Sequence, residues 1–381
     1  GDGVSGRMQV VADRATGQAR MGRFGWKAGQ PSLTDQIATA LNRDMSVKST
    51  GFPTLDCGAA QSHCDSGAAP IEDAALAELV RYVALLGVPA RRATTDATAL
   101  AGMPSSKHWV LLANYADKTL VRNDLAFTLS RSMGMAYTVR DQVVEVTLNG
   151  AYQGLYQLTE HIRVAKDRVD IPELKVTDTA ADKISGGYLI EVDFRMHKDF
   201  CKDPLNSYEA FCVNGVNTQR DTQYCADSTH GMAPFCVKEP EDMVKPEWAA
   251  QRAYVDKYFA DVEAALFGAD FKDPEKGYAK YLDVDSVIDY WLINELTKNV
   301  DGAAASFFMA KKRDGKLYFG PIWDFDLGFG NAGYNGVDKT SGWYIRSFPW
   351  FARLFEDPAF AAKAKARWAA LKADGKFEQR V

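Results

Sequence analysis

Three aspartates near the C-terminal end of the chain stand in loops beside apolar segments, where a charge is costly unless it has a use. They are Asp301, Asp324 and Asp326. Mg²⁺ takes oxygen ligands and prefers one or two carboxylates together with substrate phosphates. A separate aspartate near an attacking hydroxyl can orient it or accept its proton. We therefore predict that Asp301 is catalytic and that Asp324 and Asp326 hold a metal. The alternative is that Asp301 caps a turn while the other two anchor a loop.

The elements that would position these aspartates follow from local patterns. A helix is predicted over 284–298, with one face buried, from apolar residues at helical spacing: Val284, Val287, Ile288, Trp291, Leu292 and Leu296. Gly302 breaks the helix and leaves Asp301 at a turn. Two strands, 306–309 and 316–319, are then joined by a tight turn. A helix, an acidic turn, a hairpin and a second acidic turn form the layout of the catalytic half of a protein kinase.

The motifs in this stretch add a family resemblance. ELTKNVDG followed by GPIWDFDLGFGN resembles the CotH kinase family, the spore-coat protein kinases and their secreted bacterial relatives. The resemblance implies an atypical kinase-like fold, with ATP and Mg²⁺ used to phosphorylate Ser or Thr of a protein substrate. By position, Asp301 matches the family's catalytic aspartate and Asp324 its metal-binding aspartate. Asp326 and Asn331 belong to the same signature.

Earlier segments resemble the same family, beginning with GMPSSKHWVLLANYADKTLVRNDLAFTLSRSMGMAY and continuing through VVEVTLNGAYQGLYQLTEHI and GGYLIEVDFRM. An arginine near a nucleotide can pair with phosphate, and a kinase lysine holds phosphates while a glutamate positions it. The alternative at each position is an ordinary surface charge. The candidates for nucleotide or phosphate binding are Arg122, Glu160, Lys166, Glu191 and Lys238, together with Asn331.

The predicted fold is α+β, an atypical protein-kinase-like fold of the CotH type. Helices are predicted over 117–133 and 246–266 from apolar periodicity, and over 358–373, a segment rich in alanine and lysine. Alternating residues on both sides of Asn149-Gly150 predict a β-hairpin. Family members carry a further segment, rich in glycine, serine and lysine, that has no counterpart between residues 1 and 101. We therefore expect an incomplete N-terminal lobe.

Residues 1–92 resemble a different family, the segment between the two haem sites of bacterial di-haem, cytochrome c peroxidase-like oxidoreductases. The matching stretches include MGRFGWKAGQPSL and NRDMSVKSTGFPTLDC. Covalent haem attachment needs Cys-x-x-Cys-His, which this chain lacks, so we expect no haem. Helices are predicted over 31–45 and 71–87 within a mostly helical or irregular fragment. We place a junction at 93–101 and the kinase domain at 102–381, and interpret the chain as a fusion or chimera.

The six cysteines fall in two groups, Cys57 with Cys64 and four more in a polar insertion at 197–240: Cys201, Cys212, Cys225 and Cys236. Disulfides suit such polar loops, because core burial cannot hold them, and indicate an oxidising compartment. We expect a Cys57–Cys64 bridge and two bridges among the other four, with their pairing open. Zinc is the alternative, although the usual ligand spacings are missing. The chain is therefore predicted to be secreted or extracytoplasmic in a bacterium.

Composition limits the remaining partners. The 381 residues carry a net charge of −5, with 46% hydrophobic and 25% charged residues, typical of a globular protein. No basic patch suggests nucleic acid, and no apolar run approaches the ~18 residues of a membrane span. The predicted function is phosphotransfer from Mg-ATP to Ser or Thr of secreted or surface proteins. We expect truncation of the N-terminal lobe to weaken this activity. The alternatives are a non-catalytic coat or surface-binding protein on the same scaffold and, more remotely, a di-haem oxidoreductase fragment.

Overall fold

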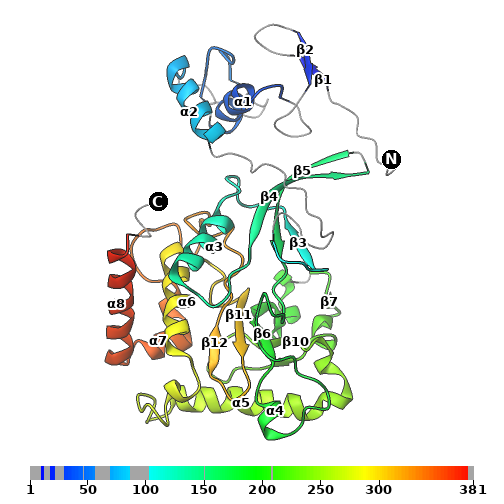
Figure 1. Ribbon diagram of the computed structural model, residues 1–381, viewed down its shortest axis with the longest axis vertical. Helices are drawn as coiled ribbons and strands as arrows, with labels where there is room; N and C mark the ends of the chain where they lie inside the picture. Colours follow the sequence, from blue (N-terminus) through cyan, green and yellow to red (C-terminus); the bar gives the residue numbers. More distant parts are fainter. Residues whose placement is uncertain are drawn as a thin grey trace. The chain divides into compact units, whose positions relative to one another are not determined.

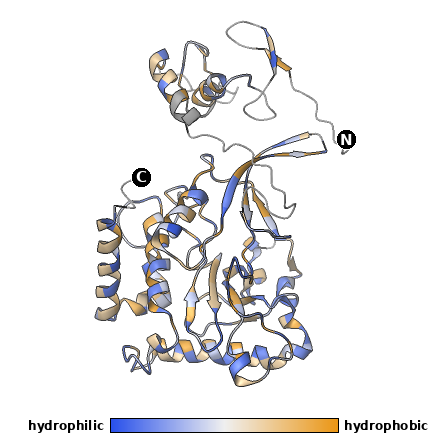
Figure 2. Ribbon diagram, viewed as in Figure 1, coloured by the Kyte–Doolittle hydropathy of each residue, from blue (hydrophilic) through white to orange (hydrophobic). Residues whose placement is uncertain are grey.

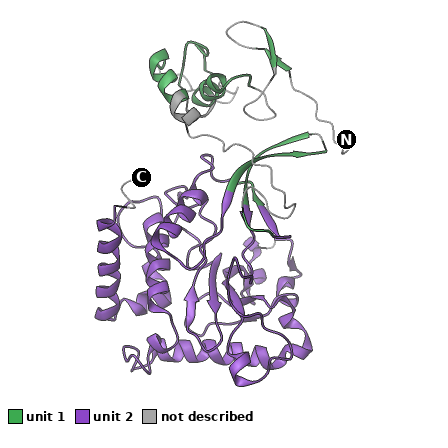
Figure 3. Ribbon diagram, in the orientation of Figure 1, with its two compact units in different colours: residues 1–105, 111–113, 142–158 green, residues 106–110, 114–141, 159–381 purple. Residues whose placement is uncertain are grey.

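The computed structural model describes residues 10–12, 18–21, 30–45, 47–55, 69–85, 103–149, 151–206 and 209–375. The chain divides into two compact units (Figure 3). Unit 1 comprises residues 1–105, 111–113 and 142–158, and unit 2 comprises residues 106–110, 114–141 and 159–381. Helices and antiparallel sheets are mixed, which confirms the predicted α+β class. No helix in the described part of the chain is long and apolar enough to cross a membrane.

Unit 1 contains two helices, α1 (Leu33–Met45) and α2 (Asp73–Leu85), at the positions predicted from apolar periodicity. They enclose a small apolar cluster made of Ile37, Ala38, Leu41, Phe52 and Leu76. Two short strands, β1 (Val10–Ala12) and β2 (Ala19–Met21), pair antiparallel. Cys57 and Cys64 lie outside the described residues, as does the junction at 93–101.

A three-stranded sheet has the order β3-β5-β4. Its strands are β3 (Trp109–Leu112), β4 (Asp141–Leu148) and β5 (Ala151–Glu160). Asn149 lies between β4 and β5 with a φ of 51°, a conformation that asparagine tolerates well and that a tight hairpin turn requires. The predicted hairpin is therefore present.

The centre of unit 2 is a five-stranded antiparallel sheet with the order β12-β11-β6-β10-β9 (Figure 1). These strands are β6 (Tyr188–Val192), β9 (Cys225–Ala226), β10 (Phe235–Glu239), β11 (Phe307–Lys311) and β12 (Leu317–Phe319). Strand β11 is apolar until its last residue, Lys311 (Figure 2), and all five of its residues are buried. A run of this kind is typical of a strand covered on both faces.

Helices pack around this sheet. They are α3 (Arg122–Met133), α4 (Ala181–Ile184), α5 (Ala249–Phe267), α6 (Val284–Thr297), α7 (Pro349–Leu354) and α8 (Pro358–Ala373). Helix α6 contacts β12, α3 and α8, while α5 contacts α7 and β9. Aromatic side chains fill the core between helix and sheet: the Tyr290 and Phe307 rings stack with their centroids 4.4 Å apart, and Phe319 meets Phe307 edge-on.

Helix α6 is buried on more of its circumference than its apolar stripe predicts. Polar residues near its C-terminal end, including Asn294 and Glu295, are buried, whereas Leu296 is 46% exposed. The prediction that Leu296 belongs to the buried face was therefore wrong. The last turn of α6 carries buried polar side chains, and these contact the acidic turn that follows.

Helix α3 begins at Arg122, five residues later than predicted, because the buried Asp117 forms a turn in front of it. The Asp117 carboxylate accepts hydrogen bonds from the backbone N–H groups of Thr119 and Arg122, both at 2.9 Å. Leu120, within this turn, has a φ of 60° and cannot continue a helix in that conformation.

The cysteine-bearing insertion contains two disulfides, Cys201–Cys212 and Cys225–Cys236. This confirms two bridges among the four cysteines. The first ends at Cys212, where the short strand β7 (Cys212–Val213) begins, and β7 pairs antiparallel with β8 (Val216–Asn217). The second joins β9 to β10, whose residues Cys225 and Cys236 lie directly opposite each other in the sheet.

Candidate active site

The turn that carries Asp301 is built by the C-terminal end of α6. Lys298 ends the helix in the left-handed conformation, with a φ of 44°. The buried Asn299 then accepts a hydrogen bond from the Asp301 backbone N–H at 3.3 Å and donates one to the Asn294 side chain at 3.2 Å. Two asparagines, buried and paired, therefore fix the backbone at Asp301.

Gly302 is required at the next position. A Cβ atom there would lie 2.4 Å from Asn294 Oδ1, well inside a normal contact. The Tyr290 hydroxyl also donates to the Gly302 carbonyl at 2.9 Å. The turn after Asp301 is thus pressed against α6 and has no room for a side chain.

The second acidic turn begins at Asp324, which has a φ of 66°. A left-handed conformation at a non-glycine residue costs energy, and such residues cluster at functional sites, although aspartate tolerates this region better than most. Ser306 Oγ donates to Asp324 Oδ2 at 3.1 Å. Because Ser306 follows the Asp301 turn, this bond links the two acidic turns directly.

Two asparagines hold the backbone of the second turn. Asn123, on α3, accepts a hydrogen bond from the Phe325 backbone N–H at 2.7 Å. Asn331 Nδ2 donates to the Asp326 carbonyl at 2.7 Å and to the Ala116 carbonyl at 2.9 Å. The turn is therefore anchored to the segment before α3 and to α3 itself.

The three aspartates act on one another electrostatically. Burial and the Asp324 charge raise the pKa of Asp301 to about 6. Burial and the same Asp324 charge, with a hydrogen bond between the two side chains, raise the pKa of Asp326 to about 6. A negative charge that raises the pKa of two neighbouring carboxyl groups marks a place where a cation would be stabilised.

The donor set suits magnesium with substrate phosphates. Among the described residues, no group of three or more His, Cys, Asp or Glu side chains is arranged to hold a metal ion alone. Mg²⁺ in phosphotransfer sites usually keeps several waters and takes only one or two carboxylates, the rest of its shell coming from phosphate oxygens. Asp324 and Asp326 stand two residues apart in one turn, close enough for the Asp324 charge to act on Asp326, and together they meet that requirement.

The charge network extends from these turns along strand β6. Asp193 follows β6 and holds Arg195 through both carboxylate oxygens, and the charge of Asp301 acts on Arg195. Glu191, two residues before Asp193 in the chain, forms an ion pair with Lys238 at 3.0 Å. Burial raises the pKa of Glu191, and Lys238 opposes that rise.

Glu191 and Lys238 line a cavity of about 520 Å³ within unit 2. Trp323, immediately before Asp324, and Phe308 of β11 also line it, so the cavity adjoins the second acidic turn. Trp323 is held in place by stacking on Phe127 of α3, with ring centroids 6.0 Å apart. The other lining residues are Val110, His161, Ile162, Thr222, Gln223, Val237, Glu239 and Glu241.

Comparison with known families agrees with this geometry. The family described as CotH kinase protein matches residues 90–380, which is most of the chain. The chain belongs to the CotH kinase family. Its kinase-like fold is therefore shown at family level, together with the α+β class. No curated protein matches the chain in sequence.

Within this CotH kinase-family chain, five of the residues predicted from sequence share one charge network: Asp301, Asp324, Asp326, Glu191 and Lys238. Asn331 joins them through its bond to the Asp326 backbone.

The remaining predicted residues have other surroundings. Glu160 is fully buried, where Arg140 binds both of its carboxylate oxygens. Arg122 forms an ion pair with Asp117, and Lys166 is exposed. The contacts of Glu160 and Arg122 hold together the segments flanking α3 and β5.

Sequence reasoning missed several residues that shape the site. The prediction selected Arg122, whereas its neighbour Asn123 is the residue that holds the Phe325 backbone. Arg195 and Ser306 were not singled out. Ser306 could have been found, since it stands five residues after Asp301, the spacing at which protein kinases place a second polar residue at the metal.

Proposed function

We propose that this chain is a protein kinase that transfers the γ-phosphate of ATP to a Ser or Thr hydroxyl, in an extracytoplasmic compartment. Family membership supports the kinase class. The two disulfides are compatible with an oxidising compartment. The observation that carries the proposal is the hydrogen bond from Ser306 to Asp324, which links the two separately anchored turns that carry Asp301, Asp324 and Asp326.

In this proposal Asp301 serves the acceptor. The hydroxyl oxygen attacks the γ-phosphorus, a new P–O bond forms, the bond to the β-phosphate oxygen breaks, and ADP leaves. The hydroxyl proton passes to the Asp301 carboxylate. A pKa of about 6 suits this role, because a base with a pKa near the working pH both is ionised and holds the proton it takes.

Asp324 and Asp326 would hold Mg²⁺, which when bound neutralises charge on the transferring phosphates. Ser306 fixes the Asp324 carboxylate through its hydrogen bond, and Asn123 and Asn331 fix the backbone of the turn. Lys238 and Glu191 would face the nucleotide from the cavity wall. The protein's contribution is then mainly positioning and charge placement.

Two measurements on the purified chain test the proposal. Thermal unfolding with and without Mg-ATP reports binding, because a ligand of the folded state raises stability. Transfer of labelled phosphate to a Ser-rich acceptor reports catalysis. We expect Asp324→Asn to lose the Mg-ATP stabilisation and Asp301→Asn to keep it while losing transfer.

The exposed Asp338→Asn serves as the matched control and should retain both properties. Binding without transfer in the unaltered chain would favour the alternative of a non-catalytic binding protein. An unaltered chain that shows neither Mg-ATP stabilisation nor transfer would contradict the proposal.

A further inference from the structure

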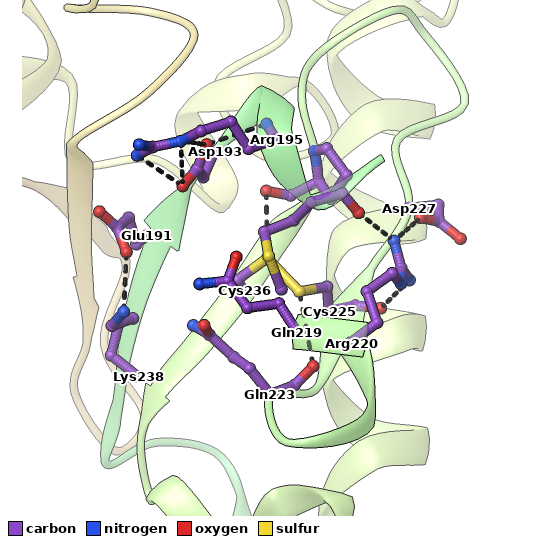
Figure 4. The surroundings of a disulfide bond; sticks show 12 residues. Glu191, Asp193, Arg195, Gln219, Arg220, Gln223, Cys225, Asp227, Cys236 and Lys238 are labelled. Carbon is purple, nitrogen blue, oxygen red and sulfur yellow. Dashed lines mark hydrogen bonds and ion pairs between the residues drawn. A yellow bond between two sulfur atoms is a disulfide. The ribbon is translucent and has the colours of Figure 1, made fainter. Parts of the chain in front are cut away.

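The cavity beside Trp323 has one wall that comes from the disulfide-bearing insertion. Thr222 and Gln223 line it from the loop that enters β9, facing a wall formed by Glu191 of β6 and Lys238 of β10. In Figure 4 the side-chain amide of Gln223 extends from its loop toward the side where Glu191 and Lys238 lie, away from Arg220 and Asp227. A residue of the insertion therefore faces the cavity.

The position of Gln223 is fixed by its neighbours. Tyr224, the next residue, accepts a hydrogen bond from the Val237 backbone N–H at 2.8 Å. One residue further, Cys225 of the edge strand β9 is bonded covalently to Cys236 of β10. The loop carrying Gln223 is thus tied to β10 by a hydrogen bond and a disulfide within two residues, which fixes the backbone from which the Gln223 side chain extends.

The amide of Gln223 has an unused hydrogen-bond donor. Its Nε2 atom is buried and has no hydrogen-bond partner in the described part of the chain. A buried donor without an acceptor carries a desolvation cost that a suitable ligand would remove. The charged groups opposite are already paired with each other, Lys238 with Glu191 at 3.0 Å. The missing acceptor is therefore expected on a ligand.

The other walls indicate the chemistry of that ligand. Trp323 and Phe308 provide aromatic surface, and Val110, Ile162 and Val237 add apolar surface. The cavity also presents the polar side chains of His161, Glu239 and Glu241. Aromatic and apolar surface together with carboxylate acceptors and one unpaired amide donor suits a flat heterocycle that has both ring acceptors and an amino group, as found in nucleobases. A glutamine amide can also pair with adenine by donating to a ring nitrogen while accepting from the amino group.

We propose that Gln223 binds the base of the nucleotide and sets a preference for adenine. This inference rests on the proposed function, because it assigns the base-binding end of the same nucleotide site. The phosphates would then lie toward the second acidic turn, which begins next to the cavity-lining Trp323. The insertion is accordingly part of the nucleotide site, and its second disulfide positions a specificity-determining residue.

The test compares a ligand that has the base with one that lacks it. Affinities for Mg-ATP, Mg-GTP and magnesium tripolyphosphate are measured by calorimetry for the unaltered chain and for Gln223→Leu. We expect Gln223→Leu to weaken ATP binding roughly two- to tenfold, the worth of one hydrogen bond, and to reduce the ATP-over-GTP preference. Tripolyphosphate affinity should not change, because that probe does not reach Gln223.

Gln153→Leu is the matched control, since Gln153 is an exposed glutamine on β5 whose amide bonds within its own strand. Unfolding midpoints establish that both variants fold. An unchanged ATP affinity in Gln223→Leu, or an equal loss for ATP and tripolyphosphate, would overturn the inference while leaving the proposed function intact. If the unaltered chain binds none of the three probes, both the proposed function and this inference are refuted.

Discussion

Replacing Asp301 by asparagine should stabilise the fold at neutral pH while abolishing phosphate transfer. Burial and the Asp324 charge raise the pKa of Asp301 from its ordinary 3.8 to about 6. A tenfold change in proton affinity corresponds to about 1.4 kcal/mol, so this difference amounts to about 3 kcal/mol against the ionised form. Asp301 keeps some solvent contact, and the asparagine is itself polar. We therefore expect a gain of about 1–2 kcal/mol.

The pH dependence has a definite sign. The folded state holds the Asp301 proton more tightly than the unfolded state does, so its favourable contribution is complete below pH 3.8 and is lost as the pH rises through about 6. Above that range the ionised Asp301 carboxylate destabilises the unaltered chain, whereas Asp301→Asn carries no such charge. The advantage of the variant should therefore appear between pH 4 and 6 and be full at pH 7.5.

The assay is thermal unfolding without nucleotide or metal at pH 7.5 and pH 4. At pH 7.5 the midpoint should rise by roughly 2–8 °C, since 1 kcal/mol moves the midpoint of a domain this large by about 2–4 °C. At pH 4 the difference should nearly vanish. The exposed Asp338→Asn should behave like the unaltered chain at both pH values. A destabilised Asp301→Asn, or a gain of equal size at both pH values, would refute the reasoning.

Three further substitutions probe the anchors of the site. Asn123→Ala removes the acceptor of the second turn's backbone amide and should cost about 1–3 kcal/mol in denaturant unfolding, with weaker Mg-ATP stabilisation; unchanged stability would contradict this anchoring role. Gly302→Ala would place a Cβ 2.4 Å from the Asn294 amide oxygen and should lower the unfolding midpoint and the transfer rate together, whereas Gly333→Ala, with open space around it, should change neither. Replacing both Cys225 and Cys236 by serine opens a short loop and should cost about 2–3 kcal/mol, measured against the unaltered chain with its disulfides intact.

Local patterns predicted the elements of this fold well. The helix α6, the hairpin of β11 and β12, and α8 appear within two residues of the positions that periodicity and turn residues indicate. Their signals are contained within each segment, so no knowledge of the rest of the chain is needed. The two acidic turns are linked by the hydrogen bond from Ser306 to Asp324, while the roles predicted for Asp301 and Asp324 stay predictions.

The parts that sequence could not predict are those created by distant packing. Glu191 meets Lys238 only because β10 returns beside β6 after the whole insertion, and sheet order is not a local property. The Asn123 side chain bonds the Phe325 backbone across 202 positions of the chain. Glu160 has the residue type of a nucleotide ligand, but Arg140 binds it in the interior. Residue type alone does not distinguish a buried structural carboxylate from an available one.

Two destabilising features occur together in the site, namely strained backbone conformations and acidic side chains held close to one another. Four non-glycine residues have positive φ angles there: Lys298, Ser306, Asp324 and Phe329. The Asp324 charge beside them also opposes the ionisation of Asp301 and Asp326. Backbone strain of this kind persists only where the surroundings enforce it, and here paired asparagines and the glycine contact with α6 do so. Like charges held rigidly together are stabilised once a cation and a phosphate chain enter, because the cation removes the repulsion and the backbone needs no rearrangement. The rigid placement of the acidic side chains therefore lowers the stability of the ligand-free protein and favours binding of Mg-ATP. For the same reason, the stabilising variant Asp301→Asn is expected to be inactive.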